Sequence, residues 1–281
     1  MRAIRASAIS EKISELFREA NYCIGEDVRT AVRRALESEP SPTGRAVLSQ
    51  LLQNYDIARD ERVAICQDTG MAVVFLDVGQ DVHIVEGDLS EAIDAGVRDA
   101  YEQGFLRKSV VRDPLYDRVN TRDNTPAVVH TRIVPGDRVE ILVTPKGFGS
   151  ENMSAVRMLV PADGEEGVIR FALETVERAG PNPCPPIVVG MGIGGTMEMA
   201  AILAKRMTAR GLDTVNEDPR YARLEALILQ KINRLGVGPA GLGGRTTALK
   251  VNIATYPTHI AGMPVAINVC CHAARHRHAV I

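Results

Sequence analysis

Residues 184–195 read CPPIVVGMGIGG, an apolar run between a proline pair and a series of glycines. The β-branched residues predict a short strand at 186–189. The glycines predict a turn directly after it, and the spacing of apolar residues beyond the turn predicts a helix over 196–209. This stretch therefore belongs to a protein that combines helices with sheet.

The same glycines, GMGIGG at 190–195, satisfy the G-x-G-x-x-G pattern of dinucleotide-binding turns, and Asp213 lies near the acidic position of that fingerprint. An NAD-dependent oxidoreductase is therefore one alternative function. Against it, residues 211–220 make a poor second strand, and too little chain follows for the rest of such a fold. The glycines can instead let the backbone pass close to a metal cluster or a helix.

Outside this stretch, helical periodicity dominates the first sixty residues, and strand patterns appear after residue 61. We predict helices at 9–20, 31–36, 43–57, 89–103, 165–178 and 221–235, and strands at 62–65, 71–78, 127–134, 138–144, 248–256 and 264–269. The strands at 127–134 and 138–144 are expected to form a hairpin. The predicted fold class is α+β (mixed α/β), with N-terminal helices followed by mixed β-sheets flanked by helices. We expect one domain over 1–281, with the helical segment 1–60 packed on it.

Composition and charge exclude several classes of protein. The 281 residues contain 33 Lys and Arg against 35 Asp and Glu, and a net charge of -2 argues against a protein that coats nucleic acid. No apolar stretch approaches the roughly 20 residues of a membrane span. The first ten residues lack the apolar core of a signal peptide. Five cysteines, an odd number spread along the chain, do not make a secreted disulfide scaffold, so we expect a cytoplasmic protein.

Three cysteine-containing segments are candidates for chemistry. Cys66 opens the turn CQDTG at 66–70, where small polar residues and a glycine can face a cavity, although a buried core cysteine is an equal alternative. Cys184 lies between prolines that stiffen its backbone, and a Cys-Pro step occurs among iron–sulfur ligands. We therefore favour a metal ligand at Cys184.

Cys270 and Cys271 end the last predicted strand and precede HAARH at 272–276. Strand alternation puts Cys271 on the same face as Val269, and Cys270 on the opposite face. If HAARH begins a helix, Cys271 stands at its positive end, where a thiolate is favoured. Cys271 is thus the better ligand, and Cys270 is expected to pack in the core.

Three cysteines from three distant segments match no zinc-finger or ferredoxin spacing, but they can supply three thiolates to one metal cluster. A [4Fe–4S] cluster held by three cysteines leaves one iron open to act as a Lewis acid on a substrate. The sequence alone makes this one arrangement among several. A zinc site at 270–278, in a zinc-stabilised binding subunit, is another, although a solvated tail is favoured over it.

Four basic residues can anchor an acidic substrate: Arg107, Lys146, Arg245 and Arg275. A lone Arg is most often a surface residue, so residue type alone decides nothing. The loop KGFGS at 146–150 is a better candidate because its two glycines expose backbone N–H groups to an anion. A second glycine turn, GLGGRTT at 241–247, lacks the Gly-Lys pair of a phosphate-binding loop and is expected to be a tight loop.

Taken together, these segments resemble the iron–sulfur hydro-lyase family of class I fumarate hydratases and L-tartrate dehydratases, closest to the separate α subunit of the two-subunit forms. The resemblance covers essentially the whole chain. The motifs that carry it are CQDTG at 66–70, LRKS at 106–109, NTRDNTP at 120–126, KGFGSEN at 146–152, CPPIVVGMGIGG at 184–195 and THIAGMPVAINVCCHAAR at 258–275. Several motifs in the same order are far more specific than any one of them.

The resemblance implies a [4Fe–4S] cluster on Cys66, Cys184 and Cys271, at a site formed by loops at strand ends. It also implies the substrate contacts, which are Gln67, Asp68, Arg107, Gly149 and His259. Asp68 and His259 are the implied catalytic residues, with Asp68 as an acid/base or hydroxyl-orienting group.

The resemblance further implies a partner. In single-chain members a second domain follows, so this chain is expected to provide half of an active site, completed by a separate β subunit in an assembly such as α2β2. The implied substrate is a small dicarboxylate, and the implied reaction interconverts (S)-malate and fumarate plus water. L-Tartrate dehydration is the alternative within the family. Neither nucleic acid nor a membrane is an expected partner.

Overall fold

The computed structural model describes residues 1–281, and the chain forms two compact units. Unit 1 consists of Met1–Gly25, Ile57–Phe148 and Arg275–Ile281, and unit 2 consists of Glu26–Asp56 and Gly149–Ala274. The chain therefore passes from one unit to the other repeatedly, and unit 1 is assembled from three separate segments. The expectation of one domain over 1–281 stays a prediction.

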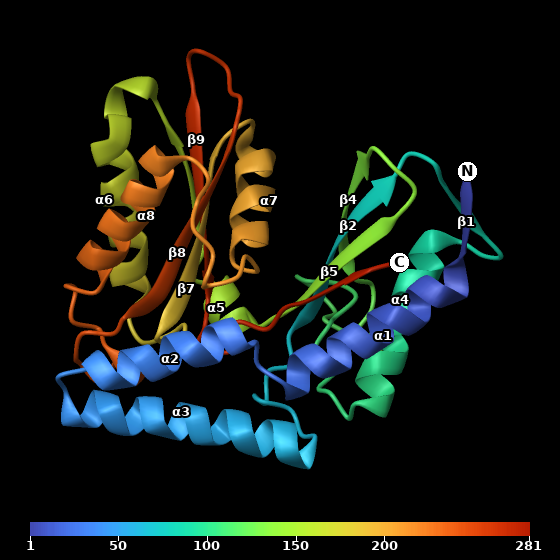
Figure 1. Cartoon of the computed structure of the whole chain (residues 1–281), viewed down its shortest axis with the longest axis horizontal. Coiled ribbons are helices and arrows are strands. Elements are labelled where there is room, and N and C mark those ends of the chain that lie inside the picture. The colour runs from blue at the N-terminus through green and yellow to red at the C-terminus, as the bar shows by residue number, and fades with distance from the viewer. The chain divides into compact units, whose positions relative to one another are not determined.

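Unit 1 is a four-stranded sheet with helices packed against it (Figure 1). The strand order is β10 (Arg277–Val280), β5 (Val139–Lys146), β2 (Met71–Gly79) and β4 (Val128–Val134). Helices α1 (Ala6–Tyr22) and α4 (Leu89–Gln103) pack together, and α1 also contacts β5. Ile9, Ile13 and Phe17 recur at helical spacing and are fully buried, so hydrophobic burial orients α1 as its periodicity predicts. A short parallel pair, β1 (Arg2–Arg5) and β3 (Val82–Val85), completes the unit.

Two expectations for this unit are wrong. Strands β4 and β5 do not form a hairpin, because β2 lies between them, parallel to β4 and antiparallel to β5. Strand β2 contains six consecutive buried residues, 72–77, and such a strand is stabilised when it is central and has a neighbour on each side. The strand expected at 62–65 is absent, because α3 (Pro42–Glu61) continues up to that point and Arg62 adopts a positive φ of 56°.

Unit 2 is a second four-stranded sheet that helices cover on both faces (Figure 1). The strand order is β6 (Ala155–Leu159), β9 (Met263–Cys270), β7 (Ile187–Gly194) and β8 (Ala248–Tyr256). Helix α7 (Met197–Met207) covers one face, while α6 (Gly164–Ala179) and α8 (Pro219–Ile232) cover the other. The remaining helical elements are α2 (Glu26–Ser38), α5 (Phe148–Glu151), η1 (Pro161–Asp163) and η2 (Pro239–Gly241). The residues of α3 and of α5 are divided between the two units. The α+β fold class is thus confirmed.

The glycines of GMGIGG serve helix packing rather than a phosphate-binding turn. Gly190 and Gly192 lie inside β7, where a Cβ would stand 2.2 Å from the Ala204 carbonyl oxygen and 2.1 Å from the Ala200 carbonyl oxygen. Only glycine lets α7 lie this close to the strand backbone. A dinucleotide fingerprint needs its glycines in the turn after the strand, so the structure contradicts the NAD-dependent alternative.

The second glycine turn, 241–247, binds a carboxylate from its own chain. Glu39 is buried, and its two oxygens accept hydrogen bonds from the backbone N–H groups of Arg245 and Thr246 and from the Thr246 hydroxyl. Burial raises the pKa of the Glu39 carboxyl, but these hydrogen bonds outweigh it and hold the pKa below its usual value. The N–H groups that could bind a phosphate therefore already donate to Glu39. This agrees with the expectation that 241–247 is a tight loop and not a phosphate site.

None of the helices combines the length and the apolar character that crossing a membrane would require.

Candidate active site

The turn CQDTG lies between α3 and β2 in unit 1. Close contacts and hydrogen bonds from other segments of the chain hold it in place. Gly70 has φ of 78°, and a Cβ there would lie 2.7 Å from backbone atoms of Lys146. The buried Tyr101 hydroxyl donates to the carbonyl oxygens of Thr69 and Gly70, at 2.8 Å each. Asn124 donates its amide N–H to the Gly70 carbonyl at 3.2 Å. The turn is therefore rigid, although it has no helix or strand of its own.

This rigidity fixes the Asp68 carboxylate. Its Oδ1 accepts from the Gly70 N–H at 3.0 Å, and its Oδ2 accepts from the Phe148 N–H at 2.9 Å. Asp68 is half-buried, and each oxygen retains acceptor capacity beyond its single backbone hydrogen bond. A carboxylate held by backbone donors on both oxygens is pre-oriented for proton transfer.

Three other predicted residues lie in this turn or beside it. The Thr69 hydroxyl donates to the Arg107 carbonyl at 3.0 Å, which joins the LRKS segment to CQDTG. The Arg107 and Gln67 side chains are exposed, and Cys66 is half-buried. Unit 1 therefore brings together Cys66, Gln67, Asp68 and Arg107, while their chemical roles stay predictions.

Arg275 is a deeply buried cation near Asp68. Its side chain is 3% exposed, Nη1 donates to Asn21 Oδ1 at 2.9 Å, and Nε has no hydrogen-bond partner. A Cβ on Gly147 would lie 3.0 Å from Asp68 Oδ2 and 3.6 Å from Arg275 Nη2. A side chain at residue 147 would therefore press on the Asp68 carboxylate and lie in ordinary contact with the guanidinium.

The same two charges act on Tyr101. Burial raises the pKa of the Tyr101 phenol, and Arg275 lowers it while Asp68 raises it. The net direction is upward, so the hydroxyl remains a protonated donor to the turn. Sequence reasoning gave no role to Tyr101, which stands in no local pattern that signals chemistry, and none to Asn124, although Asn124 lies in the NTRDNTP motif.

In unit 2, Cys184 and Cys271 lie at one end of the β7–β9 pair. Cys184 is exposed, has φ of 52° and precedes β7, while Cys271 follows the last residue of β9. The His272 N–H donates to the Cys184 carbonyl at 3.4 Å, so the two segments are in contact. Cys270 is buried and Cys271 is half-buried, which confirms the expected packing of Cys270.

Gly149 belongs to the same end of the sheet. A Cβ on Gly149 would lie 3.7 Å from the carbonyl oxygen of Asn182, two residues before Cys184. Gly149 is exposed, so its backbone can approach a ligand. Unit 2 therefore brings together Gly149, Cys184 and Cys271.

The helix expected at HAARH is absent. Residues 271–276 are irregular, and the chain continues as β10, which pairs with β5. The helix-dipole argument for a thiolate at Cys271 is therefore wrong. A buried tyrosine fixes this segment instead, because the Tyr55 hydroxyl donates to the His272 carbonyl at 3.0 Å and lies 3.2 Å from His272 Nδ1.

His259 lies at the opposite end of β9 from the two cysteines. It is exposed in the loop between β8 and β9. A strand rises about 3.3 Å per residue, so the length of β9 separates His259 from Cys271 by at least about 23 Å. Within unit 2, the structure does not bring His259 together with Cys184 and Cys271.

The zinc alternative finds no support in the arrangement of the side chains. The structure contains no group of three or more His, Cys, Asp or Glu residues arranged to hold one metal ion. The histidine-rich segment is also not a solvated tail, because Ala273, Ala274 and Arg275 are buried and residues 277–280 form an edge strand.

A family model described as fumarate hydratase (Fumerase) matches residues 10–280. The chain belongs to the fumarate hydratase family. Similar members include a putative L(+)-tartrate dehydratase subunit alpha of Methanocaldococcus jannaschii, 43% identical over 271 residues that cover 95% of each chain. The L(+)-tartrate dehydratase subunit alpha of Escherichia coli strain K12 is 32% identical over 254 residues, which cover 89% of this chain and 83% of the relative. These matches confirm the resemblance drawn from the motifs. Hydratases and dehydratases add or remove water, and this member of the fumarate hydratase family is a hydro-lyase.

Proposed function

We propose that the chain is the α subunit of an iron–sulfur hydro-lyase that interconverts (S)-malate and fumarate plus water. The observation that supports this most directly is the fixed Asp68 carboxylate, two residues from Cys66 and pre-oriented by two backbone N–H groups. L-Tartrate is the second candidate substrate, and the names of the similar alpha subunits favour it.

The cysteines fit a [4Fe–4S] cluster by their chemistry and their setting. No disulfide occupies them, and Cys66, Cys184 and Cys271 are at least partly accessible while Cys270 is buried. Thiolates are the preferred ligands of iron–sulfur clusters. Each thiolate binds a different iron of such a cluster, so the three sulfur atoms need not meet at one point. We propose Cys66, Cys184 and Cys271 as the ligands, and the bound group would supply an open iron as a Lewis acid for the substrate hydroxyl.

The remaining residues are proposed either to bind the substrate or to transfer a proton. Arg107 is proposed to bind a substrate carboxylate with its guanidinium, and Gln67 is proposed to donate an amide hydrogen bond. The Gly149 N–H is proposed to bind a substrate oxygen. Asp68 is proposed to orient the substrate hydroxyl and to exchange its proton. His259 stays a prediction outside this set, because β9 separates it from Cys271.

A β subunit is proposed to complete the site. The similar proteins are named alpha subunits, and the matched M. jannaschii chain is covered over 95% of its length. The partner is proposed to carry the base that removes the proton on carbon and further cations for the second carboxylate. The proposed assembly is α2β2.

The test is the iron and acid-labile sulfide content of the chain purified without oxygen, followed by activity together with its partner subunit. We expect about four iron and four sulfide per chain. Cys66→Ser, Cys184→Ser and Cys271→Ser should each abolish stable iron binding. Cys270→Ser and Cys23→Ser are the controls and should retain it. Iron that survives Cys271→Ser but not Cys270→Ser would overturn the ligand assignment.

Substrate choice is tested by comparing kcat/KM for (S)-malate and L-tartrate on the same preparation. A preference for (S)-malate supports the first proposal, and a preference for L-tartrate supports the second candidate. Brown, iron-loaded protein that dehydrates neither acid in the presence of its partner would contradict both.

A further inference from the structure

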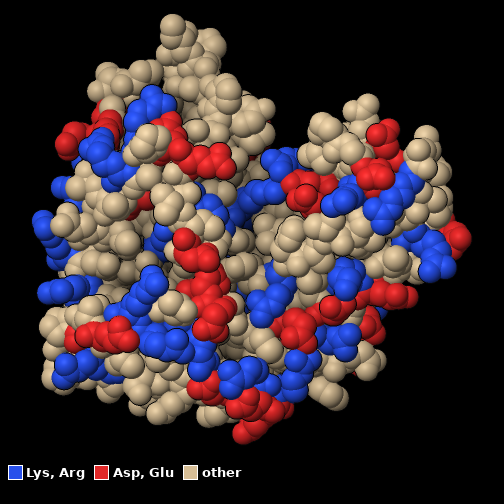
Figure 2. Space-filling model, in the orientation of Figure 1, with Lys and Arg blue, Asp and Glu red and all other residues tan.

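One end of the unit 2 sheet exposes an unusual number of large apolar side chains. We call it the sheet-end face and define it by Met158, Val160, Met197, Tyr256 and Ile260. Their exposed fractions are 59%, 50%, 58%, 50% and 90%. Strand register places them together, because Leu159 pairs with Met263, Ile193 with Val265 and Gly194 with Tyr256. Figure 2 shows an uncharged protrusion where the β8–β9 loop stands in Figure 1.

The protruding loop is held in shape. The Thr258 hydroxyl donates to the Gly195 carbonyl at 2.9 Å, and the N–H groups of Ala261 and Gly262 donate to His259 Nδ1 and to the His259 carbonyl at 3.1 and 3.0 Å. The backbone on both sides of Ile260 is therefore held in place. A preformed loop loses little conformational entropy when it binds.

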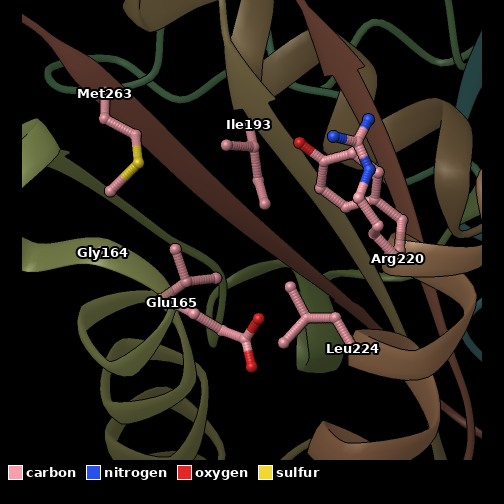
Figure 3. A pocket seen from close by; sticks show the side chains of 8 residues that line it. Gly164, Glu165, Ile193, Arg220, Leu224 and Met263 are labelled. Atoms are coloured by element: carbon pink, nitrogen blue, oxygen red, sulfur yellow. The ribbon is translucent and has the colours of Figure 1, made fainter.

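A cavity of about 250 Å³ lies at the same end, between α6, α8 and the sheet (Figure 3). Its walls are mainly apolar and include Ile193, Leu224 and Met263. Met263, which lines the cavity, is only three residues beyond Ile260, so the loop that carries Ile260 adjoins the cavity. The cavity can receive a branched aliphatic side chain.

The charges at the cavity are of opposite sign. Glu165 and Arg220 both line it. Glu165 pairs with Arg223, and Arg220 pairs with Asp218, but all four side chains are at least partly exposed, with 31% to 83% of their surface accessible. Such exposed pairs contribute little stability, so they can exchange partners at low cost.

A protrusion, a cavity and two opposite charges on one surface are what a self-complementary interface requires. Under a two-fold axis, each copy offers its protrusion to the cavity of the other, and Glu165 of one copy faces Arg220 of the other. Apolar patches of this kind on a folded protein mark association sites. We propose that two copies of this chain dimerise through the sheet-end face, with Ile260 of each copy in the cavity of the other. This proposal deepens the α2β2 assembly proposed above and rests on its two copies of this chain.

The first test is the dimer dissociation constant of the purified chain, measured by sedimentation over a range of concentrations. Ile260→Ala should weaken dimerisation by about 30-fold or more, as expected of an interface hot spot, and Ile260→Asp should weaken it further. Ile133→Asp is the matched control, because Ile133 is 69% exposed on β4 of unit 1 and should leave the constant unchanged. Both isoleucines are exposed, so neither change should unfold the chain.

The second test is a charge exchange. Glu165→Arg and Arg220→Glu should each weaken dimerisation, and the double variant should restore it, because each copy then again offers opposite charges to its partner. A chain that stays monomeric on its own, or a dimer that Ile260→Asp leaves intact, overturns the proposal. Iron content reports separately on the proposed function, since Ile260 lies at the end of β9 opposite to Cys271.

Discussion

Replacing Glu39 with glutamine tests how unit 2 fixes the 241–247 turn. Glu39 Oε1 accepts from the N–H groups of Ser41 and Arg245, at 3.1 and 2.9 Å. Oε2 accepts from the N–H and the hydroxyl of Thr246, both at 2.7 Å. Every neighbour of the carboxylate is thus a donor. In glutamine, one of these oxygens becomes an NH2 group that points at donors and accepts nothing.

The expected cost follows from these contacts. At least one buried backbone N–H loses its acceptor, which costs about 1–3 kcal/mol, and the remaining hydrogen bonds lose their charge assistance. We therefore expect Glu39→Gln to lower the free energy of unfolding by about 2–4 kcal/mol in urea denaturation. Glu37→Gln is the matched control, because Glu37 is exposed, two residues before Glu39, and its replacement should change the free energy of unfolding by no more than about 0.5 kcal/mol.

The effect should depend on pH with a defined sign. The pKa of Glu39 is lowered in the folded protein, so its carboxylate stabilises the fold fully above the unfolded value of about 4.3. This contribution is lost as the pH falls through the lower folded pKa. The difference between wild type and Glu39→Gln should therefore shrink below about pH 4. Equal urea midpoints for the Glu39 and Glu37 variants at neutral pH would refute the reasoning.

Three further substitutions test the packing and the turn. Gly192→Ala should destabilise the chain by about 1–3 kcal/mol in urea, because its Cβ would lie 2.1 Å from an α7 carbonyl, whereas Gly262→Ala meets no atom within 4 Å and should be nearly neutral. Tyr101→Phe should lower the free energy of unfolding by about 1–2 kcal/mol and should lower kcat, because the CQDTG turn loses its donor. Tyr116→Phe, at an 82% exposed residue, should change neither quantity. Gly147→Ala should reduce kcat of the assembled enzyme at least tenfold by displacing the Asp68 carboxylate, with little change in the urea midpoint.

Each of these expectations has a clear contrary result. A Gly192→Ala protein as stable as Gly262→Ala would mean that α7 can move away from β7 without cost. Full activity in Tyr101→Phe would show that other hydrogen bonds suffice to hold the turn. A Gly147→Ala enzyme with unchanged kcat would argue against a role for the position of Asp68.

Local patterns predicted the parts of this fold that depend on local physics. The spacing of Ile9, Ile13 and Phe17 predicted α1, whose apolar residues are buried. The pairing of strands is not local, and β2 inserts between two strands that are neighbours in sequence. Proximity in sequence therefore predicted a hairpin that does not exist.

The candidate site also combines features that local motifs predict with contacts that depend on distant parts of the chain. The motifs located Cys66, Asp68, Arg107 and Cys184, because these residues stand in short segments with their own signature. Tyr101 donates to the CQDTG turn, and Tyr55 donates to the His272 carbonyl beside Cys271, each from a distant part of the chain within the same unit. A single buried tyrosine has no local signal, so its partners become visible only in the fold. Arg275 does stand in a motif, but its contact with Asn21 is likewise visible only in the fold.

The three-segment construction of unit 1 has a consequence for synthesis. All of unit 2 precedes residue 275, so its sheet can form before unit 1 is complete. Strand β5 lacks one neighbour until β10 has been made, and β10 includes only residues 277–280. During translation, the edge of β5 is therefore open to pairing with another chain until residues 277–280 have been made and can pair with it.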